Sequence, residues 1–124
     1  MNNEVATFFF DTYAFFEIIR GNPKYELYKN SIAVTTIFNL AELNYGLKKE
    51  LDVKTADLIT EKYSPFLIEV TLDDIKEAMT FRMKNKELSI PDAVGYIIAR
   101  KYKIKFLTGD EDFRNMTNVE FVKK

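Results

Sequence analysis

The sequence has 124 residues and contains neither cysteine nor histidine. The absence of cysteine excludes disulfide bonds, thiolate zinc sites and cysteine nucleophiles. The absence of histidine removes the commonest general base and the commonest ligand of transition metals. Any metal ion would therefore be held by oxygen atoms, which favours magnesium, manganese or calcium.

Long apolar segments are missing as well. The apolar run at residues 5–10 lies between Glu4 and Asp11, with no basic segment before it and no small-residue cleavage site after it. No stretch approaches the length needed to cross a membrane. We therefore expect a soluble, cytoplasmic protein with no membrane partner.

The residues that are present are typical of one folded domain. Hydrophobic residues make up 47% of the chain and aromatic residues 15%, which excludes a disordered tail. The length predicts a single domain over residues 1–124. Charge is divided unevenly: residues 1–78 contain 8 basic and 13 acidic residues, whereas residues 79–124 contain 10 and 6. Solvated helix faces explain this division as well as a binding surface does.

Five short apolar runs have the length and composition of strands, at residues 5–10, 32–35, 66–70, 104–107 and 119–122. Helical patterns lie between them at residues 12–20, 37–50 and 53–63, and Thr36 is placed to cap the second helix. Two capping-box patterns, Thr71 with Asp74 and Ser89 with Asp92, begin two further helices. This alternation predicts a mainly parallel sheet of four to five strands with helices on both faces.

Acidic residues follow two of the expected strands. Asp11 comes directly after the first strand, and Asp110 and Asp112 come directly after the fourth. Asp92 lies in the first turn of a helix, and Glu42 lies inside another helix on a partly apolar face. Parallel sheets bind ligands beyond the carboxyl ends of their strands, so these acids are expected to meet at one edge.

Each acid also has a purely structural explanation. Asp11 and Asp110 can cap the segments that follow them, and Asp92 can be the second half of its capping box. Glu42 can reach solvent at the edge of its helix face. Separate caps have no reason to converge, however, whereas a site for a divalent cation requires several carboxylates in one place.

Four motifs, in this order, carry a family resemblance: "FFFDT", "TTIFNLAELNYGL", "SIPDAVGYIIA" and "FLTGDEDF". The set covers nearly the whole chain and resembles the PIN-domain nucleases, particularly the small VapC-type toxins of type II toxin–antitoxin pairs. The resemblance implies a three-layer α/β/α sandwich and a single PIN-like nuclease domain over residues 1–124. The acids and the hydroxyl residue of the family pattern fall on Asp11, Glu42, Asp92, Asp110, Asp112 and Thr108.

The resemblance implies a metal-dependent endoribonuclease that uses Mg²⁺, with Mn²⁺ as a substitute, and leaves a 5′-phosphate and a 3′-hydroxyl. Such ions lower the pKa of bound water and neutralise charge at phosphorus. This chain has no histidine that could act as the base instead. We expect direct metal contacts from Asp11, Asp92 and Asp110. Glu42 and Asp112 would bind through water or position the nucleophile, and Thr108 would hydrogen-bond a carboxylate or a metal-bound water.

Partners follow from the same resemblance: an RNA substrate, a cognate antitoxin and a second copy of the chain in a homodimer. Contact candidates, for which core packing is the alternative, are Phe15, Phe16, Ile19, Tyr28, Leu47 and Leu51. Candidates to hold RNA phosphates are Arg82, Lys84, Lys86 and Arg114. Two other functions remain open: a catalytically silent PIN-like interaction domain, and a receiver-like phospho-acceptor module, which needs an acid directly after residues 66–70.

The sequence departs from the family pattern at three positions. Gly109 stands where many relatives carry a polar or basic residue, and Tyr13 stands where a smaller residue is frequent. Asn44 occupies a position at which toxin relatives often carry arginine. These departures leave the expected metal ligands unchanged and concern the contacts around them.

Overall fold

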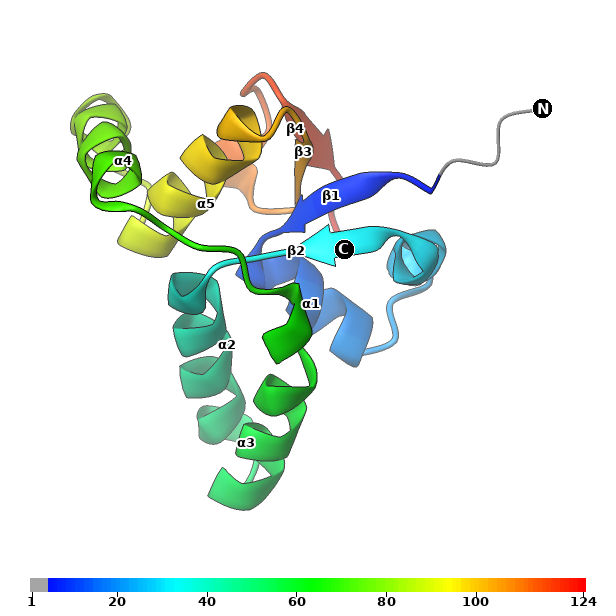
Figure 1. Ribbon diagram of the computed structural model, residues 1–124. Coiled ribbons are helices and arrows are strands. Elements are labelled where there is room, and N and C mark those ends of the chain that lie inside the picture. The colour runs from blue at the N-terminus through cyan, green and yellow to red at the C-terminus, as the bar shows by residue number, and fades with distance from the viewer. Residues whose placement is uncertain (1–4) are drawn as a thin grey trace.

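A four-stranded parallel sheet forms the centre of the molecule (Figure 1). The structure is a computed structural model, and it describes residues 5–124. The strands are β1 (Thr7–Phe10), β2 (Ile32–Val34), β3 (Lys105–Thr108) and β4 (Val119–Phe121). They lie in the order β2-β1-β3-β4, and each neighbouring pair is parallel. The predicted parallel sheet is therefore confirmed, with β1 and β3 at its centre.

Helices cover both faces of this sheet. They are α1 (Thr12–Ile19), α2 (Ile37–Glu50), α3 (Val53–Lys62), α4 (Leu72–Lys84) and α5 (Ile90–Lys101). Short 3₁₀ helices are η1 (Pro23–Asn30), η2 (Ser64–Phe66) and η3 (Glu111–Phe113). Helices α4 and α5 pack on one face, and α1, α2 and α3 pack on the other (Figure 1). This is the expected three-layer α/β/α sandwich.

Alternation along the central strands explains why both faces are apolar. Phe9 and Phe106 belong to the hydrophobic cluster beneath α4 and α5. Phe10 and Leu107 belong to the cluster beneath α1, α2 and α3. Successive side chains of a strand point to opposite faces, so a strand covered on both sides is apolar at every position.

The expected helix caps form as the sequence predicts. Thr36 accepts a hydrogen bond from the backbone N–H of Asn39 at the start of α2. Both capping boxes are complete, at Thr71 with Asp74 and at Ser89 with Asp92. None of the helices in residues 5–124 combines the length and the apolar character that a membrane crossing needs.

The strand predicted at residues 66–70 does not form. Only a single bridge joins Leu67 to Thr35, and residues 68–70 pair with no strand among the described residues. Ile68 and Val70 instead pack against the cluster beneath α4 and α5. A short apolar run buried by helices has the same residue pattern as a buried strand, so the sequence could not separate the two.

Three of the six suggested dimer contacts belong to the core. Phe15, Tyr28 and Leu47 are buried inside the protomer, so they cannot serve as a contact surface. Phe16 and Ile19 are half-buried, and Leu51 is 39% exposed. The interpretation as core packing is therefore correct for the first three.

Gly95 fixes the distance between α5 and the sheet. A Cβ atom at this position would lie 2.7 Å from a ring carbon of Phe9 and 3.1 Å from one of Phe106. The two rings are stacked with their centroids 5.4 Å apart. Because Asp92 lies one turn before Gly95, this close packing also sets where Asp92 meets the end of β1.

We predict that Gly95→Ala lowers the free energy of unfolding by about 1–3 kcal/mol through overpacking, although alanine favours a helix by about 1 kcal/mol. Phe9→Leu shortens the side chain that the new methyl group would meet. The double variant should therefore lose less stability than the sum of the single changes. Urea unfolding of the four proteins measures this coupling, and additive effects would show that Phe9 does not limit the space at Gly95.

Candidate metal centre

Asp11 lies where β1 passes into α1. Its Oδ1 atom accepts a hydrogen bond of 2.8 Å from the backbone N–H of Thr12, so it caps α1. Its Oδ2 atom accepts a hydrogen bond of 2.6 Å from the hydroxyl of Thr108, the last residue of β3. The residue is only 2% exposed. Two short hydrogen bonds thus hold a buried carboxylate at the carboxyl ends of the two central strands.

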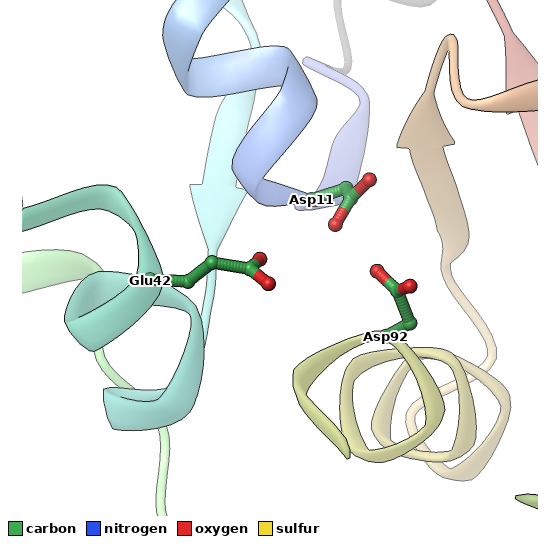
Figure 2. Close-up of side chains that lie close together, drawn as sticks. All are labelled: Asp11, Glu42 and Asp92. Carbon is green, nitrogen blue, oxygen red and sulfur yellow. The ribbon is translucent and has the colours of Figure 1, made fainter. Parts of the chain in front are cut away.

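Asp92 approaches from the other face of the sheet. Its Oδ2 atom accepts a hydrogen bond of 3.0 Å from the backbone N–H of Ser89, and the Ser89 hydroxyl accepts one from the N–H of Asp92. The capping box therefore fixes the carboxylate at the N-terminus of α5. Its side chain points toward Asp11 (Figure 2).

Glu42 completes the group from α2. Its side chain extends toward Asp11 and Asp92 (Figure 2). Within residues 5–124 it takes part in no hydrogen bond and no ion pair. One oxygen atom from each of Asp11, Glu42 and Asp92 lies within 4.8 Å of the other two. Three oxygen atoms at ligand distances of about 2.0–2.6 Å from one cation lie up to about 4.5 Å apart, so small movements of these side chains would bring all three into contact with a single ion.

Asp110 and Asp112 line the same cavity, which has a volume of about 560 Å³, but they lie outside the close group of three. Asp110 Oδ1 accepts a hydrogen bond of 3.0 Å from the backbone N–H of Asp112, so Asp110 caps η3. The Asp112 side chain is exposed. The structure therefore places all five expected acids at one cavity, and the close group contains Glu42 and does not contain Asp110.

Burial and mutual repulsion oppose ionisation of this cluster. Burial raises the pKa of Asp11 well above its usual range, and the charges of Asp92 and Glu42 raise it further, against the lowering effect of the Thr108 hydrogen bond. Burial is also the main cause that raises the pKa of Asp92 to about 6, and the charges of Glu42 and Asp110 contribute. No lysine or arginine of the described chain forms an ion pair with any of these acids.

These observations fit a divalent cation. The donor set consists of carboxylate oxygens, which are the ligands that Mg²⁺ and Mn²⁺ prefer. Several acids converge without a protein cation to neutralise them, and a bound metal ion would supply the missing positive charge. Asp11, Asp92 and Asp110 do cap helices, and they also converge with Glu42 and Asp112 at one cavity. Helix capping therefore does not exclude a role of these acids in binding a cation.

Four further residues line this cavity although the sequence did not predict them as site residues. They are Tyr13, named above as a departure from the family pattern, Phe16, named as a dimer-contact candidate, and Tyr45 and Lys49. The positions of Tyr45 and Lys49 could have been found from helical spacing, because residues three and seven positions after Glu42 share its face of the helix. Phe16 reaches the cavity because α1 packs closely against Gly46 of α2, and Tyr13 packs against Gly109, so neither position follows from one motif.

Two departures from the family pattern are in contact. A Cβ atom at Gly109 would lie 2.4 Å from a ring carbon of Tyr13 and 2.3 Å from the backbone oxygen of Val122. The Tyr13 ring therefore occupies space that a side chain at position 109 would need. The Tyr13 hydroxyl also accepts a hydrogen bond of 3.1 Å from the backbone N–H of Lys124, which joins α1 to the end of the chain.

The third departure has a role between two helices. Asn44 donates hydrogen bonds from its amide to Asp57, at 3.0 Å, and to Thr60, at 2.9 Å. Both partners belong to α3, and Lys48 of α2 also forms an ion pair with Asp57. Asn44 thus joins α2 to α3 and does not line the acidic cavity.

The parallel sheet and the convergent carboxylates define an α/β domain with a candidate divalent-cation site. Residues 8–119 match the PIN domain family. The chain therefore belongs to the PIN-domain family, as the order of its motifs predicts.

Solved structures show the same fold at low identity. A toxin–antitoxin complex from Klebsiella pneumoniae includes a chain that is 17% identical, with a TM-score of 0.74 over 94% of this chain and 99% of that one. VapBC2 from Rickettsia felis, bound to a DNA fragment of its promoter, is 15% identical with a TM-score of 0.68, covering 95% and 98%. VapBC-1 from nontypeable Haemophilus influenzae is 12% identical with a TM-score of 0.68, covering 94% and 97%. Among curated proteins, none matches this sequence.

Asp11→Asn tests whether the acids bind a cation. Asparagine keeps the shape of the cap but removes one repelling charge. In EDTA at pH 7 the variant should unfold at the same temperature as the parent or higher. Excess Mg²⁺ or Mn²⁺ should raise the unfolding temperature of the parent and have little effect on the variant, because ligands that bind the folded state stabilise it.

Asp52→Asn is the matched control for this experiment. Asp52 caps α3 by accepting a hydrogen bond of 3.1 Å from the backbone N–H of Thr55, and it is exposed away from the cavity. Asparagine caps about as well as aspartate, so stability should change little and the metal response should stay that of the parent. An equal metal response in Asp11→Asn and the parent would contradict a metal site at Asp11.

The raised pKa of Asp92 predicts a pH dependence in EDTA. Its folded pKa of about 6 lies above the usual unfolded value of about 3.9, so the folded state binds the proton more tightly. This contribution to stability is present below about pH 4 and is lost as the pH rises to about 6. The stability of Asp92→Asn relative to the parent should therefore increase by about 1–3 kcal/mol between pH 4 and pH 7. Urea unfolding across this range measures the difference, and a constant difference would contradict the raised pKa.

Proposed function

We propose that this protein is a divalent-metal-dependent endoribonuclease and the toxin of a toxin–antitoxin pair. The observation that carries the proposal is the convergence of Asp11, Glu42 and Asp92 within 4.8 Å at the end of the parallel sheet. Membership in the PIN-domain family supports a nuclease. The similar structures from Klebsiella pneumoniae, Rickettsia felis and Haemophilus influenzae support the toxin role, since the first is a toxin–antitoxin complex and the other two are VapBC2 and VapBC-1.

In this proposal Asp11, Glu42 and Asp92 hold Mg²⁺, or Mn²⁺ in its place, and Asp110 and Asp112 contribute from the rim of the cavity. Because Glu42 belongs to the close group, we propose that it contacts the ion directly in addition to the predicted contacts from Asp11, Asp92 and Asp110. A cation held there would neutralise charge on the scissile phosphate and activate water as the nucleophile.

The residues of the chain itself orient the acids and handle the proton. The Thr108 hydroxyl donates a hydrogen bond to Asp11 Oδ2 and so fixes the orientation of the carboxylate. Hydrogen bonds of this kind commonly orient the ligands of a metal ion. The side chain of Glu42 makes no hydrogen bond within the described chain, so the carboxylate oxygen that does not hold the ion is free to accept the proton of an attacking water. This assignment gives the general-base role to a carboxylate in a protein without histidine.

The contacts of the basic residues rank the candidates for phosphate binding. Arg114 donates two hydrogen bonds to Glu111, and Arg82 donates through Nε to the backbone oxygen of Leu88. Lys84 and Lys86 are exposed and form no ion pair within residues 5–124. Among these four residues we therefore favour Lys84 and Lys86 for binding RNA phosphates, and Lys86 directly precedes Glu87, which lines the cavity.

A cognate antitoxin and a homodimer are part of the same proposal, as is a cytoplasmic location. A short neighbouring reading frame that encodes a DNA-binding antitoxin would support the toxin role. For the homodimer, Phe16, Ile19 and Leu51 remain as contact candidates because they are not buried in the core.

A catalytically silent PIN-like interaction domain is the alternative that an activity measurement decides. It is disfavoured because all the expected acids line one cavity.

The receiver-like phospho-acceptor module is no longer supported. Its acceptor acid would have to follow a strand at residues 66–70, and no such strand forms.

The protein should cleave single-stranded or loop regions of labelled total RNA when Mg²⁺ or Mn²⁺ is present, and EDTA should abolish the cleavage. Asp11→Asn and Asp110→Asn should each lower the rate by at least about a hundredfold, because each removes an acid from the metal site. Asp52→Asn should cleave like the parent. Undiminished cleavage in EDTA, by protein free of contaminating nuclease, would refute the proposal.

A further inference from the structure

Tyr45 is an aromatic residue that lines the acidic cavity and yet exposes 66% of its surface. It follows Glu42 by three positions on α2, and Lys49 follows four positions later. At 1.5 Å per residue, Tyr45 and Lys49 lie about 4.5 Å and about 10.5 Å along the helix axis from Glu42. Helical spacing places all three on one face of α2.

Lys49 lies over the ring of Tyr45. Its Nζ atom is 4.3 Å from the ring centroid, within the range of a cation–π contact. Although several acids line the same cavity, Lys49 forms no ion pair with any carboxylate in residues 5–124. Its charge is therefore available to an anion from solution.

Gly46 shapes the space beside Tyr45. A Cβ atom at Gly46 would lie 2.5 Å from a ring carbon of Phe16, so the missing side chain lets Phe16 of α1 pack closely against α2. Phe16 also lines the cavity. The cavity therefore has acids at its centre and an aromatic ring with a cation on its α2 side.

This combination matches the chemistry of single-stranded nucleic acid. Proteins bind such strands by stacking aromatic side chains on unpaired bases and by placing cations beside phosphates. In a duplex the faces of each base are covered by the neighbouring bases, so an exposed tyrosine can stack only on an unpaired base.

We propose that Tyr45 and Lys49 form a nucleotide subsite: Tyr45 stacks on an unpaired base next to the phosphodiester at the acids, and Lys49 binds the next phosphate. This inference rests on the proposed nuclease function and identifies the substrate as single-stranded where it crosses α2. Both residues contact substrate in this arrangement, and neither takes part in bond cleavage.

The test uses a single-stranded oligoribonucleotide that contains the fluorescent base 2-aminopurine, with Ca²⁺ in place of Mg²⁺ and a gel to check that the strand stays intact. Binding to the parent should quench the fluorescence through stacking. Tyr45→Ala should weaken binding by about five- to a hundredfold and remove the quenching, whereas Tyr45→Phe should preserve both. Lys49→Gln should reduce the slope of log Kd against log salt concentration by about 0.7.

Tyr102 provides a matched control. It is 49% exposed, it has Lys101 Nζ 5.5 Å from its ring centroid, and it lies outside the cavity. Lys101 also forms an ion pair with Asp74. Tyr102→Ala therefore removes an exposed tyrosine beside a lysine outside the cavity and should leave affinity and quenching unchanged.

Unchanged affinity and quenching in Tyr45→Ala would overturn the subsite, as would a parent protein that binds no oligonucleotide at low salt. Sedimentation provides the remaining outcome: if Tyr45→Ala dissociates a homodimer and each protomer still binds RNA normally, Tyr45 is a protein contact and the subsite is refuted.

Cleavage assays with Mg²⁺ distinguish a failure of the subsite from a failure of the proposed nuclease function. Quenching that depends on Tyr45, in a protein that does not cleave RNA, would retain the subsite and refute the nuclease function. Cleavage that Tyr45→Ala leaves unchanged would retain the nuclease function and refute the subsite.

Discussion

Repulsion among buried carboxylates is the constraint on which the rest of this structure depends. Asp11, Glu42 and Asp92 share a small space that burial makes unfavourable for charge. Hydrogen bonds from Thr12, Thr108 and Ser89 hold two of these acids in place without neutralising them. The fold therefore maintains a concentrated negative charge that only a ligand or a proton can compensate.

The cluster is assembled across the sheet. Asp11 and Glu42 come from the layer of α1 and α2, whereas Asp92 comes from α5 on the opposite face. The distances among the acids consequently depend on how closely each layer packs, and Gly46 and Gly95 set that spacing by omitting a side chain. A cation shared by these acids would join the two layers at the end of the sheet where β1 and β3 finish.

Much of this arrangement could be predicted from the sequence because it depends on local patterns. The caps at Thr36, Thr71 and Ser89 and the acids that follow strands are readable from neighbouring residues. The bridge at Leu67, in place of a strand, depends on which distant surface covers an apolar run. The presence of Glu42 in the close group with Asp11 and Asp92 depends on how α2 packs against α1 and α5, which no single motif encodes.

The contact between Tyr13 and Gly109 has an evolutionary consequence. A side chain at position 109 would collide with the tyrosine ring, and a small residue at position 13 would leave that space empty. A side chain at position 109 would also meet the backbone oxygen of Val122, so it requires both a smaller residue at position 13 and a shift of the backbone after β4. Sequences with an aromatic residue at position 13 are therefore expected to carry glycine at position 109, and sequences with a side chain at position 109 are expected to differ both at position 13 and in the segment after β4.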